Sequence, residues 1–163
     1  MDFNKIDPTF LADLKKSDEV VYLIARNLRL NGFSVTLPPI NIRPDTSQMA
    51  AYQDEGDLLV SNSIIEVKQR PDLCFTSLSE FPYDTIIVDV VHHWESMSRK
   101  PSYYVICNSD LSGAIIVNGK TKDKWTVSTR WDGKRNRERT FYLIDIGMCK
   151  YWDFREVPKF RFE

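Results

Sequence analysis

The sequence has no apolar run long enough to cross a bilayer, and its longest hydrophobic stretches are only a handful of residues each. Its first residues also lack the basic start and apolar segment of a secretory signal. These two absences favour a cytoplasmic protein without a membrane partner, or one in the host-cell cytoplasm if a phage encodes it.

Cysteine is scarce. The three residues, Cys74, Cys107 and Cys149, are odd in number, widely spaced and form no CxxC pair. A structural zinc site needs about four close-set ligands, so this pattern argues against one. We therefore expect buried, free thiols of the kind found in a reducing compartment.

The composition is that of an ordinary folded domain. Of the 163 residues, 42% are hydrophobic and 28% are charged, and the 12% aromatic content is too high for a disordered chain. No internal repeat or low-complexity stretch divides the chain. The sequence predicts a single domain over residues 1–163, with a core at about 17–107 and C-terminal strands with a basic hairpin in 108–163.

The charge is unevenly distributed. Residues 120–139 contain eight Lys and Arg against three acids, a net charge of +5, so the rest of the chain carries about −6 of the total of −1. Cations that bind phosphates, beside Trp125 and Trp131, are typical of a nucleic-acid surface, although a solvated hairpin with its tryptophans packed underneath fits equally well. The candidate nucleic-acid contacts are Lys120, Lys122, Arg130, Lys134, Arg135 and Arg137.

Hydrophobic periodicity predicts a mixed α/β fold with one central sheet flanked by helices. A helix is expected to begin at Ser17 and to end at Gly32, followed by a strand over 33–37. The remaining expected elements are a strand pair at 57–60 and 64–68, a strand at 85–88 with a helix from 89 to about 99, and strands at 102–107, 114–117, 125–129 and 141–146. The aromatic residues after Lys150 are expected to pack on the sheet as a final strand or tail.

Three polar residues on the first strand pair suggest a chemistry. Because side chains on a strand alternate, Glu66 and Lys68 share one face and Val67 points to the other. Asp57 reaches that face if Asn62 and Ser63 form a two-residue turn, which places Leu59 opposite Glu66 and Asp57 opposite Lys68. A three-residue loop places Leu58 opposite Glu66 and turns Asp57 away, unless a bulge intervenes.

The Gly-Asp at 56–57 and the Glu-Val-Lys at 66–68 resemble the active-site motif of the PD-(D/E)XK nuclease superfamily. The resemblance implies a restriction-endonuclease-like αβββαβ core with extra C-terminal strands. It implies catalytic roles for Asp57, Glu66, Lys68 and Gln69. It also implies that Mg²⁺ or Mn²⁺ is bound by Asp57, Glu66, the carbonyl of Val67 and Glu19.

The function that this resemblance implies is a metal-dependent DNA endo- or exonuclease in repair, recombination or phage-type DNA processing, with RNA left open as a substrate and a homodimer as a possible assembly. One alternative is a catalytically inert nucleic-acid-binding module, or a nuclease subunit, of the same fold. Another is an interaction protein in which Glu-Val-Lys occurs by chance.

Two neighbouring histidines, His92 and His93, lie in the helix expected from residue 89. Histidine can act as a general base or a metal ligand. Adjacent helical residues point about 100° apart, so we do not expect both rings to bind one ion.

Overall fold

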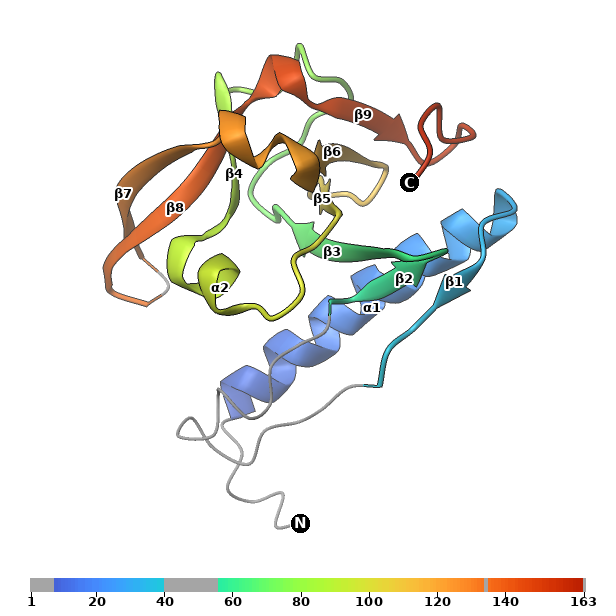
Figure 1. Cartoon of the computed structure of the whole chain (residues 1–163), viewed down its shortest axis with the longest axis horizontal. Helices are drawn as coiled ribbons and strands as arrows, with labels where there is room; N and C mark the ends of the chain where they lie inside the picture. The colour runs from blue at the N-terminus through green and yellow to red at the C-terminus, as the bar shows by residue number, and fades with distance from the viewer. Residues whose placement is uncertain (1–7, 40–55, 134, 163) are drawn as a thin grey trace.

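The computed structural model describes residues 8–39, 56–133 and 135–162 of the chain (Figure 1). The prediction for Lys134 lies outside these residues. The elements in chain order are α1 (Pro8–Leu30), β1 (Val35–Thr36), β2 (Leu58–Val60), β3 (Ser63–Gln69), β4 (Thr85–Val90), α2 (Val91–Ser96), β5 (Tyr103–Cys107), β6 (Gly113–Asn118), η3 (Gly119–Lys124), β7 (Thr126–Asp132), β8 (Arg137–Asp145), η4 (Ile146–Met148) and β9 (Lys150–Asp153).

Helix α1 begins earlier than the sequence indicated. It starts at Pro8 rather than Ser17, because proline fits the first helical turn, where its missing N–H costs nothing. The predicted end is confirmed: Gly32 has a φ of +83°, and the N–H of Phe33 donates to the carbonyl of Leu28 at 3.0 Å. None of the described helices is long and apolar enough to cross a membrane.

The predicted mixed α/β class is confirmed, but the described strands form two sheets rather than the single sheet expected. The larger sheet has six strands in the order β1-β2-β3-β5-β6-β9, and the smaller has three in the order β4-β8-β7. Among the described strand pairs of the larger sheet, only β3–β5 is parallel. The segment between β3 and β5 contains β4 and α2, and β4 pairs with β8 instead of entering the larger sheet.

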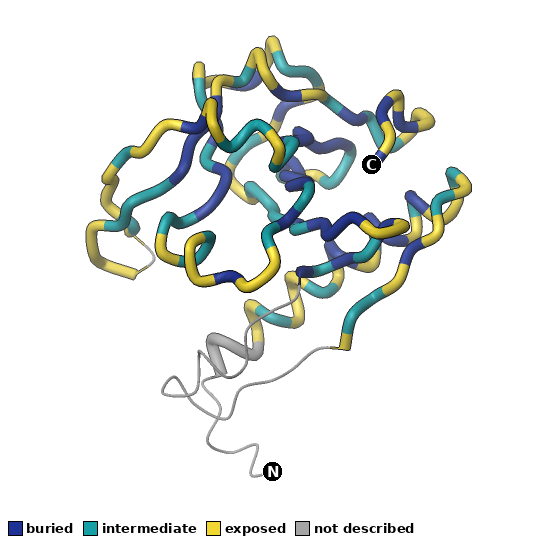
Figure 2. The backbone as a smooth tube through the Cα atoms, viewed as in Figure 1, coloured by how far each residue is buried: buried dark blue, intermediate teal, exposed yellow. Residues whose placement is uncertain are grey.

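Each face of the larger sheet has its own core. On one face α1 buries a stripe that includes Ile24 and Leu28 against Ile65 and Val67 of β3. On the other face Tyr104 and Ile106 of β5 pack with residues of the smaller sheet. Figure 1 shows α1 along one side of β1, β2 and β3, with β4, β7 and β8 away from it, and Figure 2 shows the buried segments between them. The described chain is therefore layered as helix, large sheet and small sheet.

The remaining expected elements are found with shifted ends. The helix predicted from residue 89 is shorter, at Val91–Ser96, and Asp89 belongs to β4. The aromatic C-terminal segment forms β9, and Trp152 is buried against Phe154 and Phe160, as expected.

All three cysteines are free. Cys107 and Cys149 are buried, as predicted, and burial raises the pKa of both thiols to about 12. Cys74 is exposed, so the expectation of burial is wrong for this residue.

Candidate functional site

The β2–β3 hairpin has a different register from either predicted one. Leu58 lies opposite Ile65 and Val60 opposite Ser63, so the two-residue turn consists of Ser61 and Asn62. Ser61 adopts a φ of +56°, the left-handed conformation that a tight hairpin turn uses. The turn thus begins one residue earlier than the predicted two-residue turn at Asn62 and Ser63, and every residue pair along the hairpin is shifted accordingly.

A local departure from the ladder sets the direction of Asp57. Its N–H donates to the carbonyl of Ile65 at 3.0 Å, although Ile65 already lies opposite Leu58. In the register of the ladder Asp57 falls opposite Glu66, so this hydrogen bond departs from that register by one residue. The Asp57 carboxylate then accepts the N–H of Val67 at 2.6 Å, so it is fixed at the edge of β3.

Gly56 makes this bend possible. Its φ is +92°, and a β-carbon there would lie 2.3 Å from the Cγ2 of Ile64. Proline, the nominal residue of the motif, has a φ near −65° and cannot adopt this conformation. The backbone before Asp57 therefore depends on glycine.

Glu66 and Lys68 share the face of β3 opposite α1, as predicted. The Lys68 ammonium lies 3.4 Å from Glu66 Oε1 and 3.2 Å from Asp89 Oδ1. Burial opposes the charge on Lys68, but the carboxylates of Glu66 and Asp89 outweigh it and raise the pKa of the ammonium above its ordinary value. Lys68 is thus held as a cation.

Asp89 is the residue that the sequence analysis missed. Its side chain is only 2% exposed, and it accepts hydrogen bonds from Lys68 at 3.2 Å, His93 Nδ1 at 3.0 Å, the Tyr104 hydroxyl at 2.9 Å and the N–H of Val90 at 2.8 Å. Burial raises its pKa, yet the hydrogen bond from His93 and the charge of Lys68 lower it to about 2. We call Lys68, Asp89, His93 and Tyr104 the Asp89 cluster.

The two histidines diverge, as helical geometry requires. The hydrogen bond to Asp89 raises the pKa of His93 against the effect of burial. His92 is largely exposed. The partial burial of its ring, together with the charge of Arg139, lowers its pKa. Only His93 joins the Asp89 cluster.

The predicted metal ligands come together in part. Within the described residues, no group of three or more His, Cys, Asp or Glu side chains is arranged to hold a metal ion. Glu66 supplies one carboxylate from β3 and Asp57 supplies another from the position just before β2. Because the N–H and C=O of a strand residue point to the same edge, the Val67 carbonyl lies on the side that Asp57 occupies. This oxygen-only set fits Mg²⁺ or Mn²⁺, which keep several water ligands beside one or two carboxylates.

Two predicted residues lie apart from this set. Glu19 is an exposed residue of α1, the helix whose buried stripe covers the other face of the sheet. Gln69 donates from Nε2 to the carbonyl of Ser109 at 3.2 Å, which ties the end of β3 to the segment between β5 and β6. The described contacts give Gln69 a structural role.

The basic segment forms the predicted hairpin of β7 and β8. Trp125 is buried, as the solvated-hairpin interpretation expects, whereas Trp131 is 63% exposed. Beside the hairpin, a cavity of about 650 Å³ is lined by Val91, His92, Thr129, Arg137, Glu138, Arg139 and Thr140. Val91 and His92 of this lining come directly after β4, the strand that carries Asp89.

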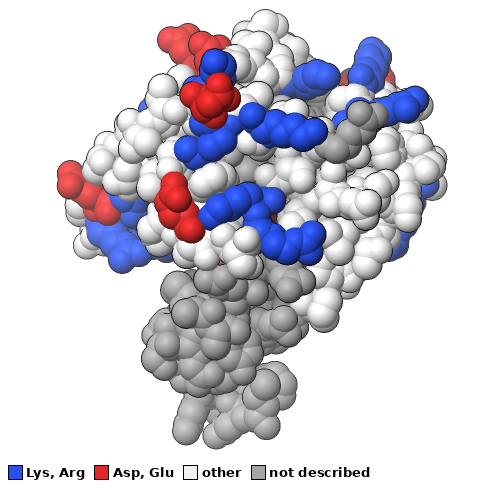
Figure 3. Space-filling view, viewed as in Figure 1, with Lys and Arg blue, Asp and Glu red and all other residues white. Residues whose placement is uncertain are grey.

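The predicted nucleic-acid contacts have different environments. Arg130, Arg135 and Arg137 are exposed on the hairpin, although Arg135 also lies 3.5 Å from Asp132. The Lys122 ammonium lies 3.9 Å from the ring centre of Tyr142 and 5.0 Å from that of Trp94, so aromatic rings hold it. Figure 3 shows Lys and Arg side chains across the middle and upper right of one face of the molecule, with acidic side chains mainly at its left.

Comparison of the chain with protein-family models, with curated proteins and with solved structures finds no match.

Proposed function

We propose that the chain is a metal-dependent phosphodiesterase that cuts DNA, with Asp57, Glu66 and Lys68 at its reactive centre. The observation that carries the proposal is the fixed position of the Asp57 carboxylate at Val67, beside the strand on which Glu66 and Lys68 share a face. Two carboxylates and a half-buried cation on or beside rigid strands are what phosphodiester hydrolysis needs.

Asp57, Glu66 and the Val67 carbonyl would hold the Mg²⁺ or Mn²⁺ ion. When bound, such an ion neutralises phosphate charge and lowers the pKa of a water molecule. The chain's own residues then have separate roles. Lys68, kept protonated by its carboxylate neighbours, stabilises negative charge that develops on the phosphate or orients the attacking water.

Asp89 acts through Lys68 as a positioning residue. Its buried carboxylate fixes the ammonium at 3.2 Å and is itself oriented by Tyr104 and His93. A group held by several hydrogen bonds needs little reorganisation when charge develops, which is the source of electrostatic catalysis. The cavity beside the β7–β8 hairpin, with Arg137 and Arg139 in its lining, is where we propose that the DNA backbone lies.

The test is cleavage of a circular plasmid in Mg²⁺, Mn²⁺ or EDTA by the wild type and by Glu66→Gln, Lys68→Ala and Asp57→Asn. We expect metal-dependent nicking that each substitution lowers at least about a hundredfold, with circular dichroism showing that each variant is still folded at the assay temperature. Asp123→Asn and Lys124→Ala, at exposed positions outside the lining of the cavity beside the β7–β8 hairpin, are the matched controls. Linear DNA and RNA of the same sequence separate an endonuclease from an exonuclease and DNA from RNA as the substrate.

A catalytically inert nucleic-acid-binding module is the second candidate. It is favoured by the absence of a third metal-binding side chain among the described residues. DNA binding without cleavage in any metal supports this candidate. If neither binding nor cleavage occurs, or if cleavage survives the substitutions, the proposed reaction is wrong.

A further inference from the structure

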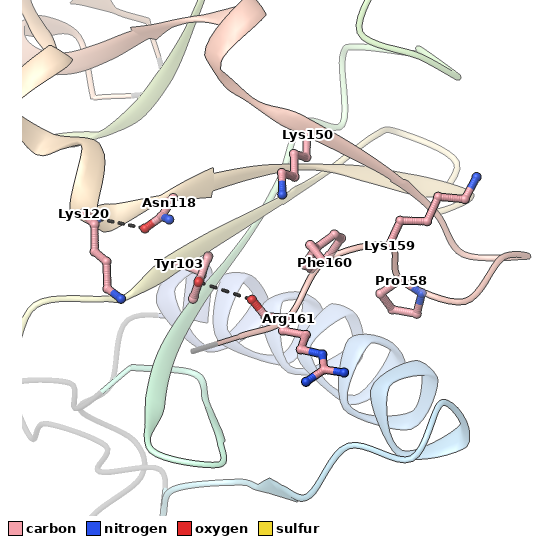
Figure 4. Close-up of a pocket in the computed structure, with 8 residues that line it drawn as sticks. All are labelled: Tyr103, Asn118, Lys120, Lys150, Pro158, Lys159, Phe160 and Arg161. Atoms are coloured by element: carbon pink, nitrogen blue, oxygen red, sulfur yellow. Dashed lines mark hydrogen bonds between the residues drawn. The ribbon is translucent and has the colours of Figure 1, made fainter.

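A second cavity, of about 550 Å³, lies at the end of the larger sheet where β5 begins and β6 ends (Figure 4). We call it the Lys120 pocket. Its lining residues come from η3, β9, the C-terminal segment and the strand ends: Tyr103, Asn118, Lys120, Lys150, Pro158, Lys159, Phe160 and Arg161. Four of these eight described residues are basic and none is acidic.

The floor of the Lys120 pocket is rigid. Tyr103 and Phe160 are 8% and 9% exposed, and Phe162 packs edge-on against both rings at 5.1 Å. The Tyr103 hydroxyl donates to the carbonyl of Arg161 at 3.3 Å, which fixes the C-terminal segment to the start of β5. The cations at the rim are therefore attached to a well-packed base.

This pocket is separate from the proposed reactive centre. Tyr103 lies beside Ile65 in the parallel β3–β5 pair and packs in the core on the α1 side of the larger sheet. Glu66 and Lys68 point to the opposite face. The two sites thus lie on opposite sides of one sheet, and the Lys120 pocket requires no role in cleavage.

The positive charges at the rim of the pocket outnumber the acidic side chains that pair with them in the described part of the chain. Lys120, Lys150, Lys159 and Arg161 are all exposed, and Figure 4 shows their side chains around Tyr103 and Phe160. Within the described part of the chain, the only ion pair among them joins Lys159 to Glu156 at 2.9 Å. Like charges at one concavity repel each other, so an anion that enters relieves the repulsion.

We propose that the Lys120 pocket binds a terminal phosphate or diphosphate group, carried by a nucleotide or by the end of a DNA strand. A phosphodiester carries one negative charge, whereas a terminal phosphate carries nearly two and presents three acceptor oxygens. Such a group can accept charge-assisted hydrogen bonds from several of the cations at once, and Arg161 can bind it through two N–H groups.

The experiment measures binding of pyrophosphate by calorimetry in EDTA, which excludes metal-dependent cleavage. We compare the wild type with the double variant Lys150→Glu, Arg161→Glu. We expect pyrophosphate affinity to fall at least about tenfold, because two charge-assisted hydrogen bonds are lost and two cations that attract the anion become anions that repel it. The double variant Lys15→Glu, Lys16→Glu changes two exposed lysines of α1 by the same charge and is the matched control, with an expected loss of less than about twofold.

Competition by one oligonucleotide with a 5′-phosphate or a 5′-hydroxyl identifies the source of the phosphate. Preference for the 5′-phosphate form assigns the site to a DNA end, and competition by neither form assigns it to a nucleotide or free diphosphate. Equal competition by both forms would mean that the pocket binds phosphodiesters, which contradicts the proposal. Equal loss of affinity in both double variants, or no pyrophosphate binding by the wild type at low salt, overturns the proposal. Because no step of this experiment measures cleavage, its result is independent of the proposed nuclease activity.

Discussion

The Asp89 cluster and the Lys120 pocket both contain concentrated charge, but they stabilise it in different ways. In the cluster a carboxylate that is 2% exposed is surrounded by four donors. In the pocket exposed cations stand above buried aromatic rings. Charges paired in a low-dielectric interior are hardly screened by salt, whereas exposed ones are screened strongly. The cluster is built for fixed geometry and the pocket for attraction.

The largest expected effect is that of removing the buried carboxylate. Asp89→Ala leaves His93 and Tyr104 without this acceptor and leaves Lys68 paired with Glu66, so we expect a loss of roughly 3–5 kcal/mol in the free energy of unfolding. Urea denaturation measures it. Asp123→Ala removes an exposed aspartate that pairs with the exposed Lys124 and should change stability by less than about 0.5 kcal/mol. Similar losses of unfolding free energy in the two variants would contradict the view that the buried Asp89 carboxylate stabilises the fold more than the exposed Asp123.

Acid should weaken the cluster. Because the fold lowers the pKa of Asp89 from 3.8 to about 2, its stabilisation is complete above pH 4 and disappears as the pH falls toward 2. This shift corresponds to roughly 2 kcal/mol. His93 has a raised pKa, so its part in the same interaction is lost as the pH rises through that value.

Urea denaturation of the wild type and Asp89→Asn between pH 2 and 8 measures this effect. The difference between the two proteins should narrow at both ends of the range. A difference that stays constant with pH would mean that Asp89 titrates alike in the folded and unfolded chains.

The bend before Asp57 gives an intermediate effect. Gly56→Ala places a β-carbon against Ile64 at a φ of +92°, so we expect a loss of about 2 kcal/mol. Gly133→Ala meets nothing within 4 Å and should be nearly neutral. Thermal and urea denaturation of the two variants compare them. If Gly56→Ala and Gly133→Ala are equally stable, the backbone before Asp57 does not need glycine.

The smallest expected effect concerns two lysines of η3. Lys122 lies over the rings of Tyr142 and Trp94, and Lys122→Ala should lose about 1 kcal/mol of stability. Lys124→Ala, at an exposed surface pair, should lose at most about 0.5 kcal/mol. Lys122→Met keeps most of the packing, so it separates the contribution of the charge. If Lys122→Met is as stable as the wild type, the rings hold the stem rather than the cation.

Local patterns predicted the local structure. The strands, the helix end at Gly32 and the shared face of Glu66 and Lys68 follow from spacing alone. The hairpin register could not be obtained this way, because a single left-handed residue, Ser61, moves the turn.

Long-range pairing was not predictable from spacing. β4 pairs with β8, which lies some fifty residues further along the chain, and not with a strand of the larger sheet. The spacing of residues within β4 contains no information about such a distant partner. Asp89 looked like a helix start, although an acid that ends the apolar run 85–88 was a signal of a buried, partnered carboxylate. The sequence singled out Lys120 but could not join it to Lys150 and Arg161, which come from two other segments.

The three free thiols have a practical consequence. Only thiolates react readily with maleimides, and the pKa values of Cys107 and Cys149 near 12 keep both protonated at neutral pH, inside the fold. Cys74 is exposed, between β3 and β4. The unmodified protein therefore accepts one fluorophore at one defined position, near the strand that carries Glu66 and Lys68, and ligand binding can be followed without engineering a cysteine.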